Sequence, residues 1–242
     1  MTSTDSRSLI PRADEPLPTG EAKTRSVQAM FDVIAPRYDL VNRVMTFRMD
    51  VGWRRRAVSA LGLPPGSTVL DLACGTGDLA RDLADRSLVP VGADLSHGML
   101  AAAPHPFPRM QADGAQLALA DGSVDGATCG FALRNFTDLA GTFAELARVV
   151  RPGGRIALLE VATPPNPLLR LGHGIYFGQV VPRIGAALSD GDAYRYLPRS
   201  VAYLPEPEEM LATLSGVGFT HVRRTLLSVG IAQLITATRS SG

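Results

Sequence analysis

The class of fold follows from one stretch, Val69-Leu70-Asp71-Leu72-Ala73-Cys74-Gly75-Thr76-Gly77-Asp78-Leu79. Residues 68–72 form the apolar run of a buried strand, and residues 78–85 have the apolar spacing of a helix. The small residues Ala73, Gly75 and Gly77 stand between them, so a ligand can approach the backbone where the strand turns into the helix. This strand–turn–helix unit predicts a binding crevice at the carboxyl end of a parallel sheet.

Strands and helices alternate downstream of this stretch. The pattern predicts strands at residues 89–93, 109–112, 126–131 and 155–161, and helices at residues 96–103 and 139–150. A helix at residues 206–214 and strands at residues 220–227 and 231–238 follow. Such alternation implies right-handed crossover connections. We therefore predict an α/β fold with a doubly wound, mostly parallel, seven-stranded Rossmann-like sheet.

The segments outside this sheet differ in composition. Residues 1–24 are rich in Ser, Thr, Pro and charge, and are predicted to be a disordered leader. Helical spacing begins near Ser26, and an apolar and basic segment spans residues 38–61, which predicts N-terminal helices. Residues 164–205 contain many Pro and Gly and are predicted to be an irregular substrate cap, inserted after the fifth strand. Residues 25–242 are then a single domain.

Composition excludes several classes of function. The formal net charge is +1, so no strongly basic field exists to bind nucleic acid. The two cysteines, Cys74 and Cys129, lie far apart and have no metal-ligand spacing, which predicts neither a disulfide nor a metal site. The sequence has no signal-peptide core and no run of about 18 apolar residues. We therefore expect a cytoplasmic protein.

Three acidic residues follow three successive predicted strands: Asp71, Asp94 and Asp113. Asp94 is placed to accept both hydroxyls of a ribose, and Asp113 with Gly114 is placed to meet an adenine edge. A carboxylate at Asp71 would repel the pyrophosphate of NAD, but would attract the ammonium and sulfonium charges of S-adenosylmethionine. We therefore predict S-adenosylmethionine as the cofactor, with NAD as the alternative. The alternative role of each acid is to cap the helix that follows it.

Five further motifs lie outside the cofactor stretch: Phe31-Asp32-Val33-Ile34-Ala35-Pro36-Arg37-Tyr38-Asp39-Leu40-Val41-Asn42, Trp53-Arg54, Leu133-Arg134-Asn135-Phe136-Thr137-Asp138, Arg151-Pro152-Gly153-Gly154-Arg155 and Tyr194-Arg195-Tyr196-Leu197. Together with the sheet pattern they resemble the UbiE/MenG/COQ5 family of quinone-biosynthesis C-methyltransferases, over about residues 27–235. The resemblance implies a class I methyltransferase that methylates a quinol ring carbon, converting demethylmenaquinol to menaquinol.

The resemblance also implies a set of cofactor contacts. It assigns Thr76, Asp94, Asp113 and Gly114 to the cofactor, and the full predicted cofactor site adds Asp71, Ala73, Gly75, Gly77, Leu95, Met99 and Gly130. Gly130 stands where the family has a serine. Residues 169–178 and 227–232 also depart from the family, at positions that would contact substrate. A methyltransferase of another small aromatic or secondary metabolite, and a non-catalytic S-adenosylmethionine-binding module, are therefore alternatives.

The resemblance places Arg134 and Asn135 at the reacting centre. There the pair would bind the oxygen of a quinol phenolate, because a guanidinium stabilises an oxyanion well. For Arg134 the alternative is a surface ion pair. Tyr38 is a third catalytic candidate, with a hydroxyl satisfied in packing as an equal alternative.

Other side chains have two interpretations each. Four tyrosines would line an apolar substrate channel or pack within loops: Tyr176, Tyr194, Tyr196 and Tyr203. Arg54-Arg55-Arg56 would contact lipid head groups or form a solvated helix face. We expect His173 to be a solvated loop residue and Cys74 to be a packing residue. The sequence leaves undecided whether the protein forms a homodimer and whether it makes a peripheral contact with a membrane.

Overall fold

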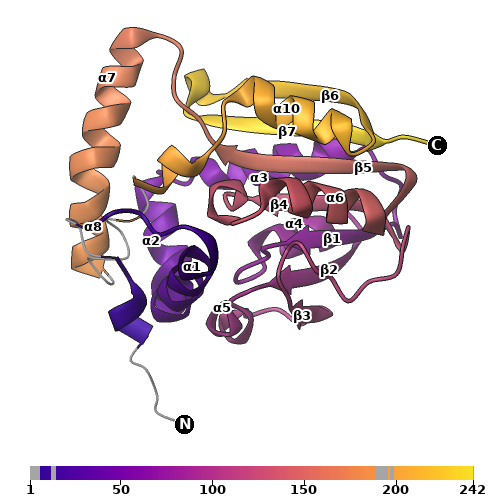
Figure 1. Ribbon diagram of the computed structural model, residues 1–242, viewed down its shortest axis with the longest axis horizontal. Helices are drawn as coiled ribbons and strands as arrows, with labels where there is room; N and C mark the ends of the chain where they lie inside the picture. The colour runs from indigo at the N-terminus through magenta and orange to yellow at the C-terminus, as the bar shows by residue number, and fades with distance from the viewer. Residues whose placement is uncertain (1–5, 12–14, 189–195, 197–198, 242) are drawn as a thin grey trace.

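The computed structural model describes residues 6–11, 15–188, 196 and 199–241, and its centre is one seven-stranded sheet (Figure 1). The strands are β1 Thr68–Leu72, β2 Val89–Asp94, β3 Arg109–Gln111, β4 Val124–Gly130, β5 Val150–Val161, β6 Phe219–Leu227 and β7 Ala232–Arg239. Their order is β3-β2-β1-β4-β5-β7-β6. The first five are parallel, and β7 is antiparallel to both β5 and β6. The predicted doubly wound, mostly parallel sheet is confirmed.

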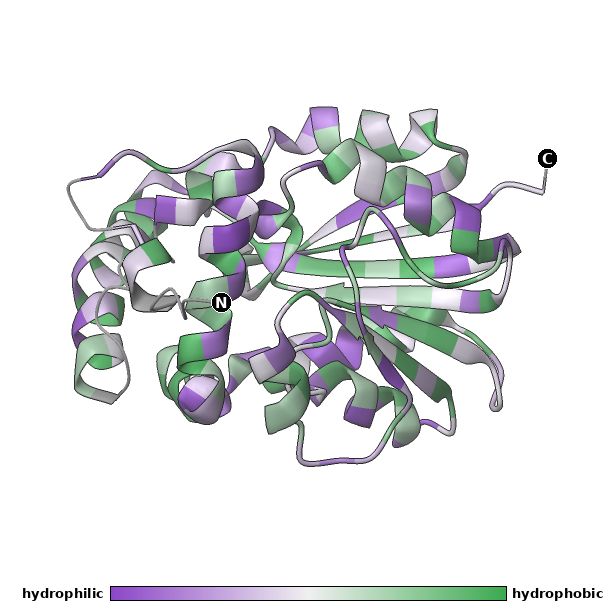
Figure 2. Cartoon of the chain, turned by 60° about the horizontal axis from the view of Figure 1, so that its bottom comes forward, coloured by the Kyte–Doolittle hydropathy of each residue, from purple (hydrophilic) through white to green (hydrophobic). Residues whose placement is uncertain are grey.

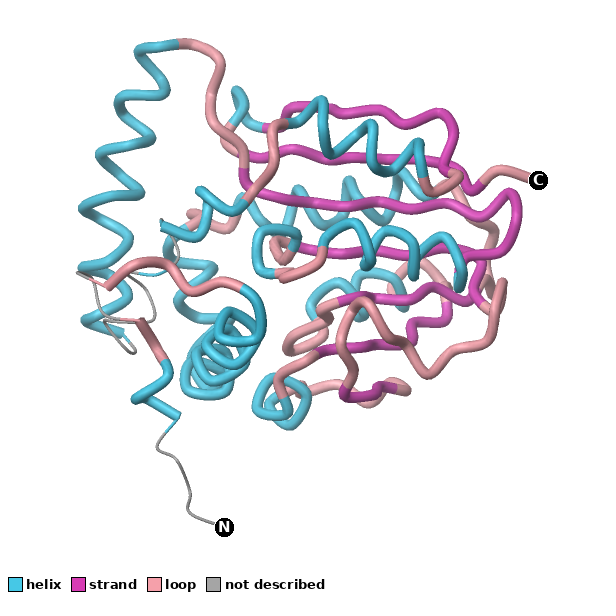
Figure 3. Tube along the Cα trace, in the orientation of Figure 1, coloured by secondary structure: helices cyan, strands magenta, loops and turns pink. Residues whose placement is uncertain are grey.

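Helices cover both faces of the sheet, as the tube trace shows (Figure 3). One face packs against α6 Leu139–Val149 and α10 Pro207–Gly216, and the other against α3 Met49–Leu61 and α4 Asp78–Ala84. Because strand side chains alternate between faces, Leu70 and Leu72 join the α6 side, while Val69 joins the α4 side. The central strands are accordingly hydrophobic over much of their length (Figure 2).

Helix boundaries near the site are set by local chemistry. α4 begins after Gly77, whose φ of 87° lies in the left-handed region. α5 His97–Ala102 begins after Ser96, whose hydroxyl accepts from the backbone N–H of Met99. α6 begins after Asp138, whose carboxylate accepts from the backbone N–H of Gly141. These caps fix where each helix starts relative to the carboxyl edge of the sheet.

The N-terminal part is more ordered than its composition predicts. It contains the 3-10 helix η1 Ser6–Leu9, α1 Gly20–Ile34, η2 Ala35–Arg37 and α2 Tyr38–Met45. Ile10 is buried in a core with Val27, Met30 and Ile34. A disordered leader over residues 1–24 is therefore wrong for residues 6–11 and 15–24, and residues 1–5 and 12–14 lie outside the described residues. α1 starts at Gly20, not near Ser26.

The insertion after β5 is helical, so the prediction of an irregular cap is wrong for residues 167–188. α7 Pro167–Ile175 continues through a π-helical turn, η4 Tyr176–Val180, into α8 Val181–Leu188, and η5 Val201–Tyr203 follows. Pro167 stands at a helix start, where its missing N–H costs nothing, and the Asn166 side chain caps that start. In the part of the chain that is described, no helix is both long enough and apolar enough to cross a membrane.

Candidate active site

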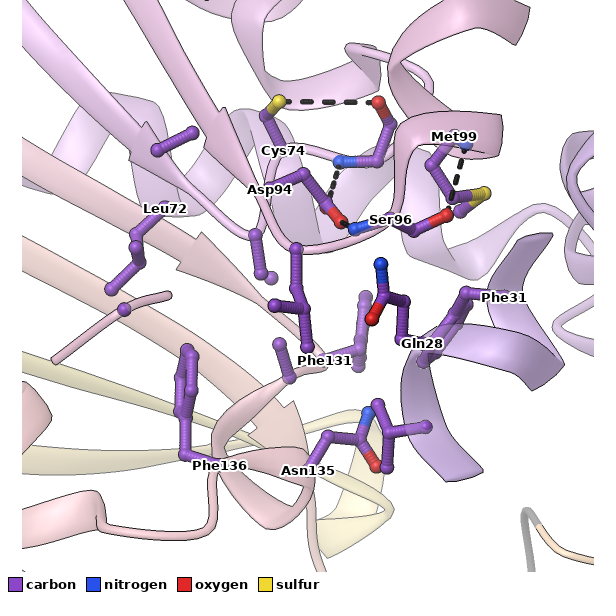
Figure 4. Close-up of a pocket in the computed structure, with 18 of the residues that line it drawn as sticks. Gln28, Phe31, Leu72, Cys74, Asp94, Ser96, Met99, Phe131, Asn135 and Phe136 are labelled. Carbon is purple, nitrogen blue, oxygen red and sulfur yellow. Dashed lines mark hydrogen bonds between the residues drawn. The ribbon is translucent and has the colours of Figure 1, made fainter. Parts of the chain in front are cut away.

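A cavity of about 310 Å³ lies at the carboxyl ends of β1, β2 and β4, and α1 and α2 close it from the other side (Figure 4). Most residues predicted for the site line it: Tyr38, Asp71, Ala73, Gly75, Thr76, Asp94, Leu95, Met99, Asp113, Gly114, Gly130 and Asn135. Two predicted residues, Gly77 and Arg134, do not line it. The volume is that of a small-molecule site.

The loop after β1 wraps closely around the cavity. Ala73, Gly75 and Gly77 all have positive φ, at 53°, 55° and 87°. A Cβ on Gly77 would lie 2.6 Å from the ring of Phe107, so only glycine fits there. The backbone N–H of Gly75 donates to Asp94 at 2.8 Å, which holds the loop against the end of β2.

Asp94 accepts from two backbone N–H groups of residues that line the cavity. Its two carboxylate oxygens accept from the N–H groups of Gly75 and Ser96, each at 2.8 Å. A carboxylate has about four acceptor positions, so each oxygen retains capacity for a ligand hydroxyl. Burial raises the pKa of Asp94. The N-cap of α5 is Ser96, so helix capping does not explain this aspartate.

Asp71 is fully buried, and only one of its two carboxylate oxygens has a hydrogen-bond partner among the described residues. Its Oδ1 accepts from the hydroxyl of Thr128 at 2.9 Å, whereas its Oδ2 has no hydrogen-bond partner among the described residues. Burial raises the pKa of Asp71 to about 7. The N-cap of α4 is Gly77, so Asp71 does not cap that helix. A buried acceptor oxygen beside a cavity is the kind of group that a cationic ligand stabilises.

Asp113 follows β3 and lies nearer the solvent. Its Oδ1 accepts from the N–H of Ala115 at 3.0 Å, which forms the turn beyond the strand. The adjacent Gly114 is packed beneath Phe136, and a Cβ there would lie 2.7 Å from that ring. No described helix starts at Asp113, so the capping alternative does not apply to it.

The N-terminal helices are tied to the site by polar side chains. Asp32 of α1 accepts from the Ser96 hydroxyl at 2.5 Å and from the Gly98 N–H at 2.8 Å. Asp39 of α2 accepts from the Thr76 hydroxyl at 2.6 Å. Asp32 and Asp39 stand in the first family motif, but no role was predicted for either, because their partners lie on distant parts of the chain.

A buried lysine adds a further tie. Lys23 of α1 donates to the carbonyl of Phe136 at 2.8 Å, and its ammonium lies 3.9 Å from the centre of the Tyr203 ring. Burial lowers its pKa to about 8. Sequence reasoning missed Lys23, because nothing in the spacing of α1 distinguishes it from a solvated helix lysine.

Tyr38 lines the cavity with its ring against Phe31, edge to face, at 5.8 Å between centroids. Burial is the main cause that raises its pKa, and an interaction with the side chain of Asn42 opposes that shift. A phenol with a raised pKa is a poor base but remains a hydrogen-bond donor. Tyr38 is therefore placed both to pack and to donate to a ligand.

Arg134 is buried in an ion pair instead of facing the cavity. Its guanidinium binds the carboxylate of Glu160, donates to the Phe131 carbonyl at 2.8 Å and donates to the Ser200 hydroxyl at 3.0 Å. The Arg134 backbone N–H also donates to Glu160. Arg134 therefore does not line the cavity, as a residue that binds a substrate oxyanion would. It does form an ion pair, but that pair is buried and not at the surface. Glu160 and Ser200 were not predicted.

Asn135, the next residue, does face the cavity. It is 8% exposed, and neither its amide nitrogen nor its amide oxygen has a hydrogen-bond partner among the described residues. Its amide lies below Gln28 in the close-up, with Phe131 and Phe136 nearby (Figure 4). An unpaired buried amide costs free energy unless a ligand satisfies it. Asn135 therefore presents an unpaired donor and an unpaired acceptor at the cavity.

The tyrosines follow the packing interpretation as far as they are described. Tyr176 donates to the Met45 carbonyl at 2.7 Å, Tyr203 donates to the Pro18 carbonyl and Tyr196 is buried. None of these three lines the cavity, and Tyr194 lies outside the described residues.

Of the remaining candidates, Cys74 is a buried free thiol, and burial raises its pKa, as expected for a packing residue. His173 is on α7, not in a loop, and is half-buried beside Phe177. Arg54 is buried among three aspartates, so the lipid and solvated-face interpretations are both wrong for it.

Comparisons with known proteins agree with this geometry. The family model described as the ubiE/COQ5 methyltransferase family matches residues 19–239. A ubiquinone/menaquinone biosynthesis C-methyltransferase UbiE from Syntrophotalea carbinolica is 42% identical, over 89% of this chain and 95% of that protein. A demethylmenaquinone methyltransferase from Thermus thermophilus is 42% identical, over 85% and 97%. A solved SAM-dependent methyltransferase from Thermotoga maritima shares the fold, with a TM-score of 0.62 and 19% identity, over 87% of this chain and 98% of that one.

Proposed function

Because the chain belongs to the ubiE/COQ5 methyltransferase family, we propose that it transfers a methyl group from S-adenosylmethionine to a ring carbon of a quinol, converting demethylmenaquinol to menaquinol. The relatives whose names include menaquinone match almost their full length. The observation that carries the proposal is a cavity with an unpaired carboxylate oxygen at one side and an unpaired amide at the other, Asp71 and Asn135.

The donor set of the cavity fits S-adenosylmethionine. Asp94 would accept from the ribose hydroxyls, and Asp71 would face the ammonium of the amino-acid tail. Asp113 and Gly114 would meet the adenine. At Gly75, which lines the cavity, a Cβ would lie 3.2 Å from the Met99 side chain, so the glycine lets the loop pack closely against Met99. When bound, this cofactor supplies a methyl group already activated by a positive sulfur.

NAD fits the same residues poorly. Its pyrophosphate would lie where the β1 loop turns, beside the fully buried Asp71. Two negative groups in a buried site repel each other strongly, because little water remains to screen them. The charge of the site therefore favours the methyl donor.

At the substrate, Asn135 would donate its amide N–H to the phenolate oxygen beside the reacting carbon. An ionised quinol hydroxyl makes that carbon nucleophilic, and a positioned N–H donor stabilises the oxyanion without reorganisation. Arg134 would act as a positioning residue: Glu160 and Ser200 fix its guanidinium, and its backbone fixes the neighbouring Asn135. Phe31, Phe131 and Phe136 would exclude water from the reacting atoms.

The direct test is a transfer assay with methyl-labelled S-adenosylmethionine and reduced demethylmenaquinones, followed by mass for the gain of one methyl group. We expect transfer by the wild type. Asn135→Asp, which keeps the size but removes the N–H donor, should lower kcat about 100-fold. Its affinity for S-adenosylmethionine should stay within about threefold, because Asn135 is assigned to the substrate side.

Two outcomes would contradict the proposal. Transfer to small aromatics but not to any quinol would support a different substrate class. Tight cofactor binding without transfer to any acceptor would support a non-catalytic binding module.

A further inference from the structure

An exposed apolar surface lies on α7, on the solvent side of α2 and on the turn that follows α2. On α7 the side chains of Leu168, Leu171 and Ile175 are 77%, 63% and 51% exposed, and their spacing places them on one face of the helix. No residue of α7 is buried. The helix stands at the edge of the molecule, away from the sheet (Figure 1). A short helix is marginal in water by itself, so this face has the character of a surface that something covers.

The surface continues onto α2. Leu40 and Val44 are exposed on successive turns of α2, and Phe47, in the turn after the helix, is 70% exposed. The Phe47 ring lies beside Tyr176, at 5.7 Å between centroids, and the Tyr176 hydroxyl donates to the Met45 carbonyl. The two helices therefore present neighbouring apolar side chains. We name Leu40, Val44, Phe47, Leu168, Leu171 and Ile175 the α2–α7 surface.

The backbone holds Phe47 outward at a conformational cost. Phe47 and Arg48 both have positive φ, at 50° and 61°, a conformation that residues with a side chain rarely adopt. Strain of this kind persists where surrounding contacts enforce it, and it is concentrated at functional positions. Here it presents one large apolar ring and one cation to solvent.

The charges on the α7–α8 side of the surface are all of one sign, whereas on α2 the half-buried Asp39, which accepts from Thr76, precedes Leu40. Residues 162–188 contain Arg170, His173 and Arg183 but no aspartate or glutamate. Arg48 and Arg183 are exposed, and neither forms an ion pair with a residue that the structure describes. Apolar side chains flanked by cations match the interface of an anionic bilayer. A second copy of the chain would instead bring the same arginines face to face.

We propose that the α2–α7 surface docks on an anionic phospholipid bilayer, with Phe47, Leu168, Leu171 and Ile175 inserted among the lipid chains near the head groups. This inference deepens the proposed function, since a quinol with an isoprenoid tail resides in a bilayer. Docking does not depend on turnover, so a failure of either proposal is distinguishable from a failure of the other.

The test is flotation of the full chain with vesicles of phosphatidylcholine containing about one third phosphatidylglycerol. The wild type should bind these vesicles, bind pure phosphatidylcholine weakly and lose binding in about 0.5 M salt. Leu171→Glu and Phe47→Glu, two separate variants at exposed positions, should each lower the partition coefficient about tenfold or more. Val89→Glu is the matched control, because Val89 is also exposed but lies on β2. It should bind as the wild type does.

Three results would overturn the proposal. The first is no binding of the wild type to anionic vesicles. The second is equal loss in Val89→Glu and Leu171→Glu. The third is a wild-type dimer in analytical ultracentrifugation that Leu171→Glu converts to monomers, which would assign the surface to a second copy. Methyl transfer to a tail-less quinol in solution should be unchanged in Leu171→Glu, which confirms that the variant is folded.

Discussion

Two groups of buried and half-buried aspartates differ in how their charge is balanced. The guanidinium of Arg54 forms ion pairs with three carboxylates, those of Asp50, Asp78 and Asp82. Asp71 and Asp94, at the carboxyl edge of the sheet, form no ion pair with any described residue and are bound only by N–H and O–H groups. The first group has its counter-charge in direct contact, whereas Asp71 feels the charge of Arg54 only at longer range and without an ion pair.

This difference separates a mainly structural role from a mainly binding role, although Arg54 and Asp78 also line the cavity. A compensated cluster stabilises the fold, and removing its cation leaves charges buried without partners. An uncompensated carboxylate costs free energy in the empty protein, and a cationic ligand recovers that cost on binding. Changes in the Arg54 cluster should therefore act on stability, and changes at the sheet edge on affinity.

The largest expected effect is on the compensated cluster. Arg54→Met should lower the free energy of unfolding by about 3–5 kcal/mol, because three carboxylates lose their shared partner. Urea denaturation measures this. Arg151→Met, which breaks the more exposed pair with Asp125, is the matched control and should cost less than about 1 kcal/mol. Equal losses in the two variants would mean that the Arg54 cluster has no special structural role.

The second largest expected effect is on cofactor affinity, from a change at Asp94 on the carboxyl edge of the sheet. Asp94→Asn should weaken S-adenosylmethionine binding about 100-fold in calorimetry, because charged acceptors for the ribose and for two backbone N–H groups are lost. Asp82→Asn, the same change in the Arg54 cluster, should leave affinity within about threefold. If Asp94→Asn binds as tightly as the wild type, the ribose site has been misplaced.

A smaller effect follows from the pKa of Asp71, which burial raises to about 7. Because the folded pKa exceeds the unfolded value of 3.8, the folded state holds an extra proton between these pH values, and the stability of the empty protein falls as pH rises from about 4 to about 7. A cationic ligand prefers ionised Asp71. Affinity for S-adenosylmethionine should therefore rise about eightfold from about pH 6 to about pH 7.5. Calorimetry across this range measures it, and Asp71→Asn should be nearly flat. An equal rise in Asp71→Asn would assign the titration to another group.

The sequence predicts the part of the fold that contains the sheet edge well. The pattern predicts the first strand at residues 68–72, where β1 lies, because a short apolar run ended by small residues has few alternatives. The acids that follow the strands, Asp71, Asp94 and Asp113, all line one cavity, because parallel strands end at the same edge of the sheet. β5 begins at Val150, earlier than residue 155, because pairing with β4 extends the strand past the Pro152-Gly153-Gly154 turn.

Tertiary contacts explain what the sequence did not predict. Residues 164–205 read as irregular because Gly172, Gly174, Gly178 and Pro182 weaken helix propensity, yet the segment from residue 167 to residue 188 is helical. Arg134 could not be separated from Asn135 by position, because its partner Glu160 lies on another strand. The local sequence pattern identifies which polar residues lie near the sheet edge. It does not identify which of them already have a hydrogen-bond or ion-pair partner within the protein.

We propose that Asp71, which forms no ion pair with a described residue, offers its negative charge to the positive tail of the ligand. The most direct measurement is a calorimetric comparison of S-adenosylmethionine with 5′-methylthioadenosine, which has the same nucleoside but no ammonium and no sulfonium. The wild type should prefer S-adenosylmethionine by about tenfold or more at about pH 7.5, and Asp71→Asn should lose most of that preference. A preference that is unchanged by Asp71→Asn would contradict the claim.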